Sequence, residues 1–393
     1  MTLRIFYSAG SGDVVNSFNC WERGIDDPTE LSVTYSSQFF SVCEDIEANA
    51  LIVTSNPNAE DLKVNNFEIV NRKILLNKSN GIFYHVGQVL YSIILIKEAI
   101  KYKADLAILG GVSHWYLFSV LKVFGIKVVP TLHCAFWPQG YKKETYAQKV
   151  LRVFDGLFWR YVADATICVS PECERQVINI AKNVNGPIYQ SRAFYRRCLF
   201  DKCSASKENG TKVVLMYAGR IEKEKGVFRL LSLVAILEKK YPHKFLLKLY
   251  GKGSAEGELG KSIRCQGLEK QVIYCGRKNR DELIKAFYES DIVIVPTTKY
   301  FAEGLNKVCV EGVLSCRPVV TTTLSNANDV IGDAIVCLEN DDIESYANAI
   351  EELIKNNSLY SAKVEAAKIH KEIFFDPKCS WGTSLKKAIR DLN

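Results

Sequence analysis

Two series of short apolar runs that alternate with helical segments constrain the fold of this chain more than any other feature. The first series covers residues 4–170, and the second begins at residue 213. Alternation of this kind implies parallel strands joined by helical crossovers. A polar stretch without periodicity at residues 203–211 separates the two series and is typical of a linker. The sequence therefore predicts an α/β protein with two Rossmann-like domains that face each other across a cleft.

The expected elements follow from these runs. Strands of the first series are expected at residues 4–9, 32–37, 50–55, 67–73, 105–111, 127–133 and 164–170, and helices at 82–102, 113–124, 144–162 and from residue 171 on. In the second series we expect strands at 213–218, 245–250, 272–275, 292–295, 318–322 and 334–338, with helices at 226–240, 256–265, 280–289, 307–314, 342–354 and 358–373. We predict domains at residues 1–205 and 206–393, and we expect a last helix at about 378–391 to return to the first domain.

Composition argues against several classes of protein. The net charge of +7 is spread over the chain, with 21 Lys and Arg against 18 Asp and Glu in residues 1–200, so a nucleic-acid-binding domain is not indicated. The 13 cysteines form no C-x-x-C pair, and we expect them to be buried thiols in a reducing cytosol. The sequence shows no signal-peptide pattern and no apolar segment of the ~20 residues that cross a bilayer, so we expect a cytoplasmic protein.

The stretch from Glu303 to Glu311 follows an apolar run at residues 291–297 that is typical of a buried strand. Glu303 is expected in a loop beyond the carboxyl end of that strand, and Glu311 about two turns into the next helix. The backbone N–H groups of residues 304–307 are expected to be unpaired at the helix start, where they can hold an anion. Because carboxylates suit sugar hydroxyls and free amides suit phosphate, this stretch predicts a nucleotide-sugar site.

Other loops at predicted strand ends carry candidate site residues. Arg220 and Lys225 follow the strand at residues 213–218, and a guanidinium with an ammonium group suits a diphosphate. Gly10 and Gly12 follow the first strand, where they allow a ligand to approach the backbone closely. His133 ends the strand at residues 127–133, at the edge where open α/β sheets bind ligands. Each of these features alone is equally compatible with an ordinary turn or a structural histidine.

Together these motifs resemble those of GT-B glycosyltransferases of the family-4 retaining type. The resemblance is strongest over residues 212–354, through the G-R-x4-K-G loop at 219–226, Y-G-K-G at 250–253, V-I-Y-C-G at 272–276 and the E-x7-E pair of Glu303 and Glu311. In the first half it depends on the glycine loop and His133. It implies a GT-B fold and transfer of a sugar from a UDP- or GDP-sugar with retention of anomeric configuration.

The resemblance also implies roles for individual residues. Glu303 would bind the transferred sugar and support its developing positive charge, while Arg220 and Lys225 would neutralise the diphosphate leaving group. Glu311 would hold the ribose hydroxyls, and His133 would contact the sugar from the opposite domain. The catalytic set would be Glu303, His133, Arg220 and Lys225. The further donor-binding residues would be Gly12, Gly251, Arg277, Lys278, Gly304, Leu305, Asn306, Lys307, Val308 and Glu311.

Some residues depart from the usual pattern of the family. Asn306 and Lys307 stand where a glycine and a hydrophobic residue are usual, and Asn tolerates a left-handed backbone better than most residues. The G-G-x-x-E element common after the strand at 318–322 is here only N-A-N-D at 326–329. The chain has no D-x-D motif, and we expect neither a metal nor another cofactor because Arg and Lys supply the positive charge.

Three alternatives share parts of this pattern. A GT-B-like nucleotide-sugar epimerase would have the same fold but would need additional acid and base residues, which the sequence does not identify. A non-catalytic nucleotide-sugar-binding protein would not require Arg220, Lys225, Glu303 and Glu311 to converge. A nicotinamide dehydrogenase fits the alternation but lacks G-x-G-x-x-G at the glycine loops.

A basic segment points to the acceptor. Residues 142–197 hold ten Lys and Arg against five Asp and Glu, and the helix expected at 144–162 carries Phe154, Phe158, Trp159 and Tyr161. These residues suit an interfacial helix on a membrane, although a core helix with a solvated basic edge explains them equally well. We expect a lipid-linked saccharide acceptor in surface polysaccharide or glycoconjugate biosynthesis, with peripheral contact of the first domain to the cytoplasmic face of a membrane.

Overall fold

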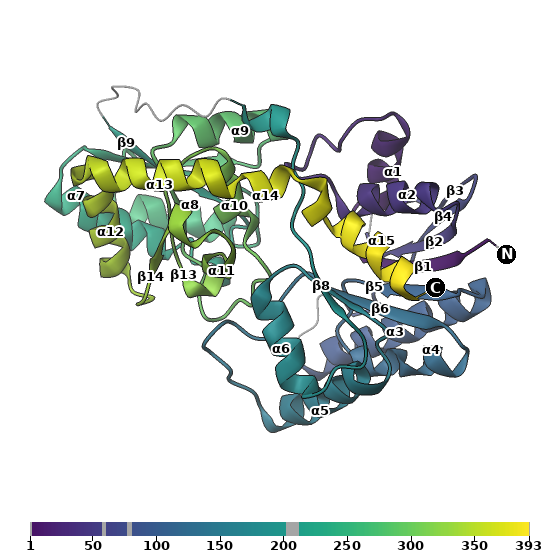
Figure 1. The fold of residues 1–393 in the computed structure, drawn as a ribbon. Helices are drawn as coiled ribbons and strands as arrows, with labels where there is room; N and C mark the ends of the chain where they lie inside the picture. Colours follow the sequence, from purple (N-terminus) through teal and green to yellow (C-terminus); the bar gives the residue numbers. More distant parts are fainter. Residues whose placement is uncertain (1, 57–59, 77–80, 202–211, 393) are drawn as a thin grey trace.

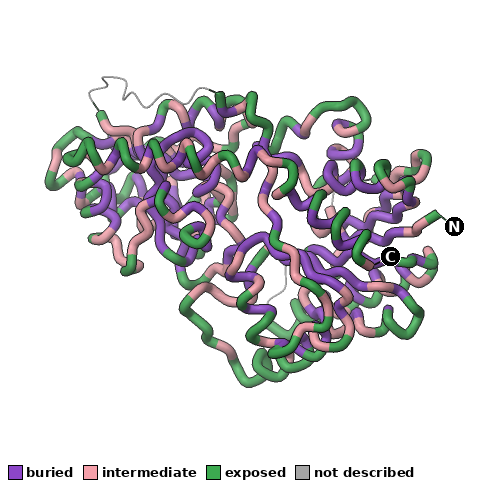
Figure 2. The backbone as a smooth tube through the Cα atoms, viewed as in Figure 1, coloured by how far each residue is buried: buried purple, intermediate pink, exposed green. Residues whose placement is uncertain are grey.

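The computed structural model describes residues 2–56, 60–76, 81–201 and 212–392 (Figure 1). Two α/β domains lie side by side, with the N-terminal one purple to teal and the C-terminal one mostly green (Figure 1). The strands at the centre of each domain are buried, and the helices around them expose one side to solvent (Figure 2). The predicted linker and the predicted boundary between residues 205 and 206 lie outside the described residues.

The N-terminal domain is built on an eight-stranded sheet in the order β3-β4-β2-β1-β5-β6-β7-β8. Neighbouring strands are parallel except β3 and β4. The strands are β1 (Arg4–Gly10), β2 (Asn49–Thr54), β3 (Leu62–Val64), β4 (Phe67–Asn71), β5 (Leu106–Leu109), β6 (Lys127–Leu132), β7 (Thr166–Cys168) and β8 (Ile188–Gln190). The central strands read as continuous apolar runs because helices cover both faces of the sheet.

Two helical layers enclose this sheet. Phe18 of α1 and Phe39 of α2 pack on one face, and Leu95 of α3 and Trp159 of α5 pack on the other. The helices are α1 (Val14–Glu22), α2 (Tyr35–Asp45), α3 (Ile82–Tyr102), α4 (Val120–Val123), α5 (Tyr146–Tyr161) and α6 (Pro171–Ala181), with short 3-10 turns η1 (Trp115–Ser119) and η2 (Arg197–Phe200). The carboxyl ends of β1 and β6 are left to face the second domain.

The C-terminal domain has a six-stranded, fully parallel sheet in the order β11-β10-β9-β12-β13-β14. Its strands are β9 (Val213–Ala218), β10 (Phe245–Tyr250), β11 (Val272–Gly276), β12 (Ile292–Val295), β13 (Val319–Thr322) and β14 (Ile335–Leu338). Its helices are α7 (Arg229–Lys240), α8 (Glu256–Cys265), α9 (Arg280–Glu289), α10 (Lys307–Leu314), α11 (Asn328–Ile331), α12 (Ile343–Lys355), α13 (Asn357–His370) and α14 (Glu372–Phe375). Short 3-10 turns lie at η3 (Lys223–Lys225), η4 (Thr323–Ser325), η5 (Gly332–Ala334) and η6 (Pro377–Cys379). The predicted strands and helices of this half are thereby confirmed to within a few residues.

The chain crosses between the domains twice. Residues 191–200 lead into the second domain, and residues 374–381 lead back to helix α15 (Trp381–Leu392), which packs on α2 of the first domain (Figure 1). The two crossing segments are joined by hydrogen bonds from the Tyr195 N–H to the Phe374 carbonyl, 2.9 Å, and from the Arg192 N–H to the Cys379 carbonyl, 2.8 Å. This double crossing fixes which sheet edges meet in the cleft.

The strand expected at residues 32–37 is wrong. The Thr34 hydroxyl accepts a hydrogen bond from the backbone N–H of Ser37, at 3.0 Å, and this cap starts α2 at Tyr35. Only Ser32 keeps an isolated bridge, to Tyr195. The helix expected at 113–124 is also different, because it is divided into the 3-10 turn η1 and the single turn α4.

The expectation for the helix at 144–162 is wrong for two of its four aromatic residues. Phe158 and Trp159 are fully buried between α5 and the sheet, so they belong to the core and cannot meet a membrane. Phe154 and Tyr161 are exposed on the opposite side. One face of the helix therefore packs in the core, and its opposite, apolar face is uncovered.

The sequence led us to expect that the cysteines are buried thiols, and this expectation is wrong for some of them. Cys134, Cys198 and Cys265 are free and exposed. Cys316 is disulfide-bonded. Cys134 follows His133 directly and therefore lies at the cleft.

Candidate active site

Glu303 is buried in the loop between β12 and α10, where three donors converge on one of its oxygens. Its Oε1 accepts hydrogen bonds from Lys225 Nζ at 2.6 Å, Asn306 Nδ2 at 2.8 Å and Thr297 Oγ1 at 3.0 Å. Among the described residues none donates to Oε2. The carboxylate is thus fixed in position by one oxygen, and the other oxygen remains available to a ligand.

The Glu303 loop also touches the first domain directly. The Ala135 N–H donates to the Glu303 carbonyl at 3.1 Å, and Leu305 packs against the apolar cores of both domains. Gly304 faces the His133 carbonyl so closely that a Cβ at this position would lie 2.0 Å from that oxygen. Only glycine fits there, because any side chain would push the two domains apart.

Lys225 and Arg220 lie at the same edge of the C-terminal sheet as Glu303. Lys225 Nζ is 3.7 Å from the centre of the Phe301 ring, and the Arg220 guanidinium is 5.1 Å from it. Arg220 is exposed, whereas Lys225 is largely enclosed by Glu303 and Phe301. The two cations therefore form a positive patch beside one fixed carboxylate, as the sequence predicted from their place at strand ends.

The start of α10 differs in detail from the expectation of free amides. Asn306 is the N-cap, with an extended and not a left-handed backbone, and its Oδ1 accepts from the N–H groups of Val308 and Cys309. Its own N–H donates to the Ser325 carbonyl at 3.0 Å. The expectation that every amide of residues 304–307 is unpaired is therefore wrong at Asn306, because its amide and side chain close the loop onto itself.

Glu311 is buried in helix α10, eight residues after Glu303. Tyr195 from the crossing segment donates to Glu311 Oε1 at 3.2 Å. Burial raises the pKa of the Glu311 carboxyl to about 7, although Lys307 and the Tyr195 hydroxyl oppose the shift. The carboxyl thus changes charge near neutral pH.

His133 stands at the end of β6 on the other side of the cleft. Its ring lies 4.2 Å from the Tyr35 ring, and burial, with a smaller effect of the Lys307 charge, lowers its pKa to about 4. Nε2 lies 3.3 Å from Thr131 Oγ1, which accepts a hydrogen bond from Trp381 Nε1 at 2.8 Å. The Thr131 hydroxyl can then donate to Nε2, and this assigns the ring proton to Nδ1.

Nδ1 of His133 is buried, and no described residue pairs with it. A buried polar nitrogen without a partner is costly, so its neighbourhood favours a polar ligand. His133 lines a cavity of about 700 Å³ between the two domains. The same cavity is lined by Gly12, Tyr35, Arg277 and Lys307, so it joins both sheet edges.

The remaining predicted residues are spread around this cleft. Gly251 has a positive φ of 138°, and a Cβ there would lie 1.8 Å from the Gly219 carbonyl, so the loops after β9 and β10 touch. Lys278 forms an ion pair with Glu282 at 3.0 Å outside the cavity, while Lys307 donates to Ser32 Oγ at 3.0 Å across the domains. Val308 lies half-buried in the first turn of α10.

Sequence analysis missed Thr297 and Asn326, and it named Asn306 only as a donor-binding residue. Thr297 and Asn306 hold the Glu303 carboxylate, and Asn326 donates to the carbonyls of Glu303 and Gly304 at 2.7 and 3.1 Å. Asn326 belongs to the N-A-N-D segment that departs from the family pattern, and it has a left-handed backbone. Its position after β13 was the one signal that pointed to it.

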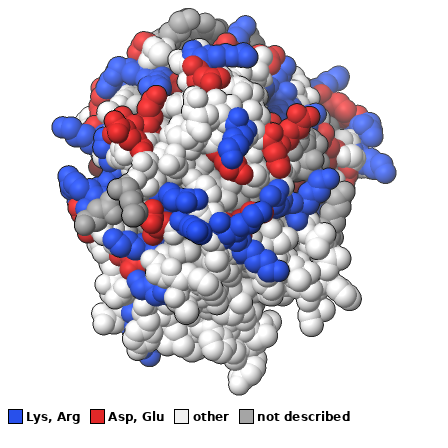
Figure 3. Space-filling model, turned by 90° about the vertical axis from the view of Figure 1, so that its right-hand side faces the viewer, with Lys and Arg blue, Asp and Glu red and all other residues white. Residues whose placement is uncertain are grey.

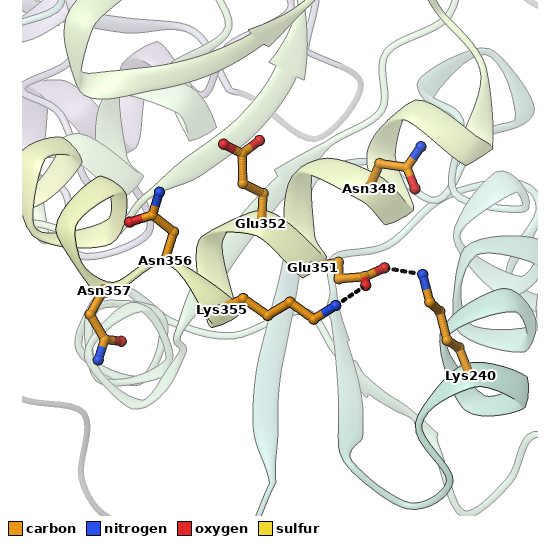
Figure 4. Close-up of a pocket in the computed structure, with 7 residues that line it drawn as sticks. All are labelled: Lys240, Asn348, Glu351, Glu352, Lys355, Asn356 and Asn357. Atoms are coloured by element: carbon orange, nitrogen blue, oxygen red, sulfur yellow. Dashed lines mark hydrogen bonds and ion pairs between the residues drawn. The ribbon is translucent and has the colours of Figure 1, made fainter.

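A second hollow lies between α7 and α12, away from the predicted site residues (Figure 4). Three of its side chains are paired, because Glu351 binds both Lys240 and Lys355 (Figure 4). None of the predicted site residues lines it. Within residues 2–56, 60–76, 81–201 and 212–392 no cluster of three His, Cys, Asp or Glu side chains is arranged for a metal ion. No helix in that part of the chain is long and apolar enough to cross a membrane.

Comparison with known proteins finds a family likeness in the C-terminal half of the chain. Residues 201–370 match the family model described as glycosyl transferases group 1. The chain is 24% identical over 241 residues to an uncharacterized glycosyltransferase of Methanocaldococcus jannaschii, which covers 60% of this chain and 63% of the relative. It is 31% identical over 156 residues to the capsular polysaccharide biosynthesis glycosyltransferase CapM of Staphylococcus aureus, which covers 37% of this chain and 38% of the relative. The matches thus span about two fifths to three fifths of these curated relatives.

Solved structures extend the likeness to both domains. HepE of Anabaena, in complex with UDP, superposes with a TM-score of 0.67 at 14% identity and covers 99% of each chain. Sucrose-phosphate synthase of Thermosynechococcus elongatus gives a TM-score of 0.72 at 14% identity, again over 99% of each chain. At such identities the likeness establishes the fold. The protein has the GT-B fold, and its residues 201–370 resemble the group 1 glycosyl transferases.

Proposed function

We propose that this protein is a retaining glycosyltransferase that moves a sugar from a nucleoside-diphosphate donor to a saccharide acceptor. The observation that carries the proposal is the Glu303 carboxylate, which is held at Oε1 by Lys225, Thr297 and Asn306 and open at Oε2. A fixed carboxylate of this kind costs no reorganisation when positive charge develops on a sugar ring. Glu303 would bind the sugar hydroxyls and stabilise that charge.

The positive patch would receive the diphosphate. An ammonium group has three N–H donors, and Lys225 uses one on Glu303, so others remain for phosphate oxygens. Arg220 is exposed and adds a planar guanidinium that matches phosphate geometry. These two side chains would neutralise the charge that accumulates on the leaving group, and for this reason we propose that the reaction needs neither a metal nor another cofactor.

The nucleoside would lie toward α10 and the loop after β11. Glu311 would hold the ribose hydroxyls, and Arg277, which lines the cleft cavity, would border the base. The structural neighbour HepE was solved with UDP, with UDP and glucose and with UDP-glucose. These complexes favour a UDP-sugar over a GDP-sugar as the first donor to test.

His133 would contact the donor sugar from the first domain. Because its pKa is lowered to about 4, the ring is neutral at physiological pH. Its unpaired Nδ1–H would donate to a sugar hydroxyl or to the departing oxygen. The acceptor would enter beside the first domain, and we propose a lipid-linked saccharide in polysaccharide biosynthesis, in line with the name of the relative CapM.

One experiment tests this proposal directly. The protein is incubated with UDP-glucose or GDP-mannose and an oligosaccharide acceptor, with and without EDTA, and the anomeric configuration of the product is read by NMR. Retained configuration and full activity in EDTA are expected. An inverted product, or loss of activity in EDTA, contradicts the mechanism, and an epimerised sugar formed from the donor alone identifies an epimerase instead.

A further inference from the structure

Helix α5 has two apolar faces, and the protein covers only one of them. Its inner face buries Phe158 and Trp159 completely. Its outer face exposes apolar side chains at the spacing of three and four residues that places them on one side of a helix. These side chains are Tyr146, Val150, Val153, Phe154, Leu157 and Tyr161.

The neighbouring helices α3 and α4 add to this exposed face. Residues 82–96 of α3 include no Lys, Arg, Asp or Glu, and the most exposed apolar side chains there are Ile82, at 74%, and Phe83, at 62%. On α4 the Val123 side chain is 84% exposed, beside Phe124. Single exposed apolar residues are common in soluble proteins, but three helices with such residues on one side are not.

Ring contacts join α3, η1 and α5 into one surface, which we call the apolar tip and which includes α4, the direct continuation of η1. His85 of α3 lies 5.3 Å from His114, and His114 lies 5.9 Å from Tyr116 of η1. Tyr116 lies 5.6 Å from Phe154 of α5. The apolar tip is therefore continuous from the first turns of α3, across η1 and α4, to the outer face of α5.

Positive charge borders the apolar tip, and negative charge is neutralised. Residues 81–163 hold ten Lys and Arg against four Asp and Glu. The four acids each have a partner: Glu98 pairs with Arg72, Glu144 and Asp155 pair with Arg152, and Asp105 accepts from the Arg4 N–H. Lys143 and Lys149 are exposed at the start of α5. In Figure 3 the lower part of the molecule, where α3, α4 and α5 lie, is mostly white, with Lys and Arg in a band above it.

We propose that the apolar tip inserts into the surface of an anionic lipid bilayer, with Lys143, Lys149 and the other exposed Lys and Arg around it at the level of the headgroups. An uncharged end bordered by cations and tyrosines fits the two zones of a bilayer surface, hydrocarbon and anionic headgroup. A second copy of the chain would bring two positive borders together, and this arrangement is unfavourable. The bilayer thus accounts for the apolar and the basic residues at once.

The basic segment at residues 142–197 contributes less to membrane binding than its charge implies. Arg152 is tied to Asp155 and Glu144, and Arg160 donates to the Ala181 carbonyl. Arg175 is paired with Glu172 and Asp329. Because these guanidinium groups are engaged inside the protein, apolar insertion supplies most of the binding and the exposed lysines supply the preference for anionic lipid.

The apolar tip also stands in a useful place for the acceptor, a step that rests on the proposed function. The loop at residues 133–145 begins beside Glu303, where the Ala135 N–H meets the Glu303 carbonyl, and ends at the N-terminus of α5. Along it, Lys142 lies 4.2 Å from the Trp137 ring. A saccharide whose lipid lies in the bilayer could follow this loop from the apolar tip to the cleft.

Vesicle sedimentation tests the proposal. The full chain is mixed with vesicles of phosphatidylcholine alone and of phosphatidylcholine with phosphatidylglycerol, at low and high salt. Three variants are compared. The apolar-tip variant combines Phe83→Gln, Val123→Gln and Val153→Gln, and the matched set combines Ile25→Gln, Ile273→Gln and Ile369→Gln at exposed sites off the apolar tip. The lysine variant combines Lys142→Glu, Lys143→Glu and Lys149→Glu. Thermal unfolding checks that each variant is folded.

We expect the protein to bind the mixed vesicles, with part of the binding surviving high salt. The apolar-tip variant should lose about 100-fold or more in partitioning, the matched set should lose little, and the lysine variant should lose chiefly the preference for anionic lipid. The proposal is overturned if the wild type stays in the supernatant, if the apolar-tip variant binds as the wild type does, or if the lysine variant alone abolishes binding. A wild-type dimer that the apolar-tip variant converts to a monomer would show an interface between copies and would also overturn it.

The same variants separate this inference from the proposed reaction. UDP binding measured by calorimetry, and transfer to a water-soluble oligosaccharide, should be unchanged in the apolar-tip variant, because its three side chains lie outside the cleft. If vesicle binding holds while no sugar transfer is found, the proposed function is wrong and the membrane surface stands. If transfer holds while vesicle binding fails, the membrane surface is wrong.

Discussion

The two domains share one architecture but use it differently. In the C-terminal domain, the loops at the carboxyl ends of β9 and β12 bring Lys225 and Arg220 next to Glu303, and opposite charges are fixed by short contacts. In the N-terminal domain, the corresponding sheet edge offers a glycine loop, a neutral histidine and the Tyr35 ring. The first arrangement suits a charged donor, and the second suits a polar, uncharged saccharide.

The difference extends to the outer surfaces. The C-terminal domain exposes few large apolar side chains, whereas the N-terminal domain exposes an apolar surface over three helices. A fold of this kind can keep one domain for a constant chemical task and adapt the other to the acceptor. Changes in the C-terminal site should therefore affect chemistry most, and changes in the N-terminal domain should affect positioning.

The largest effect is expected at Glu303. The Glu303→Gln substitution keeps the shape and removes the charge, and we expect transfer to fall by about 10²–10³-fold, because one preorganised charge contact contributes this much to a transition state. Initial rates of product formation measure it. Glu269→Gln, at an exposed glutamate away from the cleft, is the matched control. Normal turnover by a folded Glu303→Gln protein would show that this carboxylate is not the catalytic one.

Arg220 comes next. We expect the Arg220→Ala substitution to lower transfer by about 10²-fold and to weaken UDP binding, because it removes an exposed guanidinium that no described carboxylate binds. Calorimetry with UDP and with uridine separates the contribution of the diphosphate. Lys223→Ala, in the same loop, removes a cation that is paired with Glu258 and should change little. Equal losses in both variants would mean that only net charge matters.

The sequence predicted that Glu303, Arg220 and Lys225 lie close together because each is placed by local sequence. Glu303, Arg220 and Lys225 each follow an apolar run directly, and the carboxyl ends of parallel strands must meet at one edge of a sheet. The residues that hold Glu303 from a distance could not be found in this way. Asn326 comes from another strand end, and its role depends on a left-handed backbone that no motif announces.

The N-terminal domain was harder to predict for a physical reason. Periodicity shows that α5 is apolar on two sides, but only packing decides which side the protein covers. The sequence therefore offered Phe158 and Trp159 as surface residues, although both are core residues. In the same way residues 32–37 were expected to form a strand, whereas the Thr34 cap starts a helix.

A smaller effect should distinguish Glu311 from Glu303. Because burial raises the pKa of Glu311 to about 7 from its usual value of 4.5, the native carboxyl is mostly protonated at pH 6 and mostly ionised at pH 8. Ribose hydroxyls are bound by the ionised form, so UDP affinity should rise about tenfold from pH 6 to pH 8. The Glu311→Gln variant should lack this part of the rise.

The same shift has a consequence for the protein without ligand. The folded state holds the proton between pH 4.5 and 7, whereas the unfolded state releases it, so the Glu311 contribution to stability is lost as pH rises through that window. Relative to the Glu311→Gln variant, the wild type should therefore unfold at a lower temperature at pH 8 than at pH 5. A wild type and variant with parallel pH profiles would contradict the raised pKa.

The smallest effect is expected where the C-terminal helix supports the N-terminal side of the cleft. Trp381 donates to Thr131, which in turn contacts His133, so the last helix orients a histidine of the first domain. The Trp381→Phe substitution should lower transfer about fivefold through the lost hydrogen bond, and should cost about 1–3 kcal/mol of stability. Trp159→Phe is a matched control, because Trp159 is equally buried in the same domain and its Nε1 pairs with no described residue. Similar losses of stability with unequal losses of transfer would assign the difference to the orientation of His133. Equal losses of transfer would show that Trp381 acts only through packing, and the link between the last helix and the cleft would be purely structural.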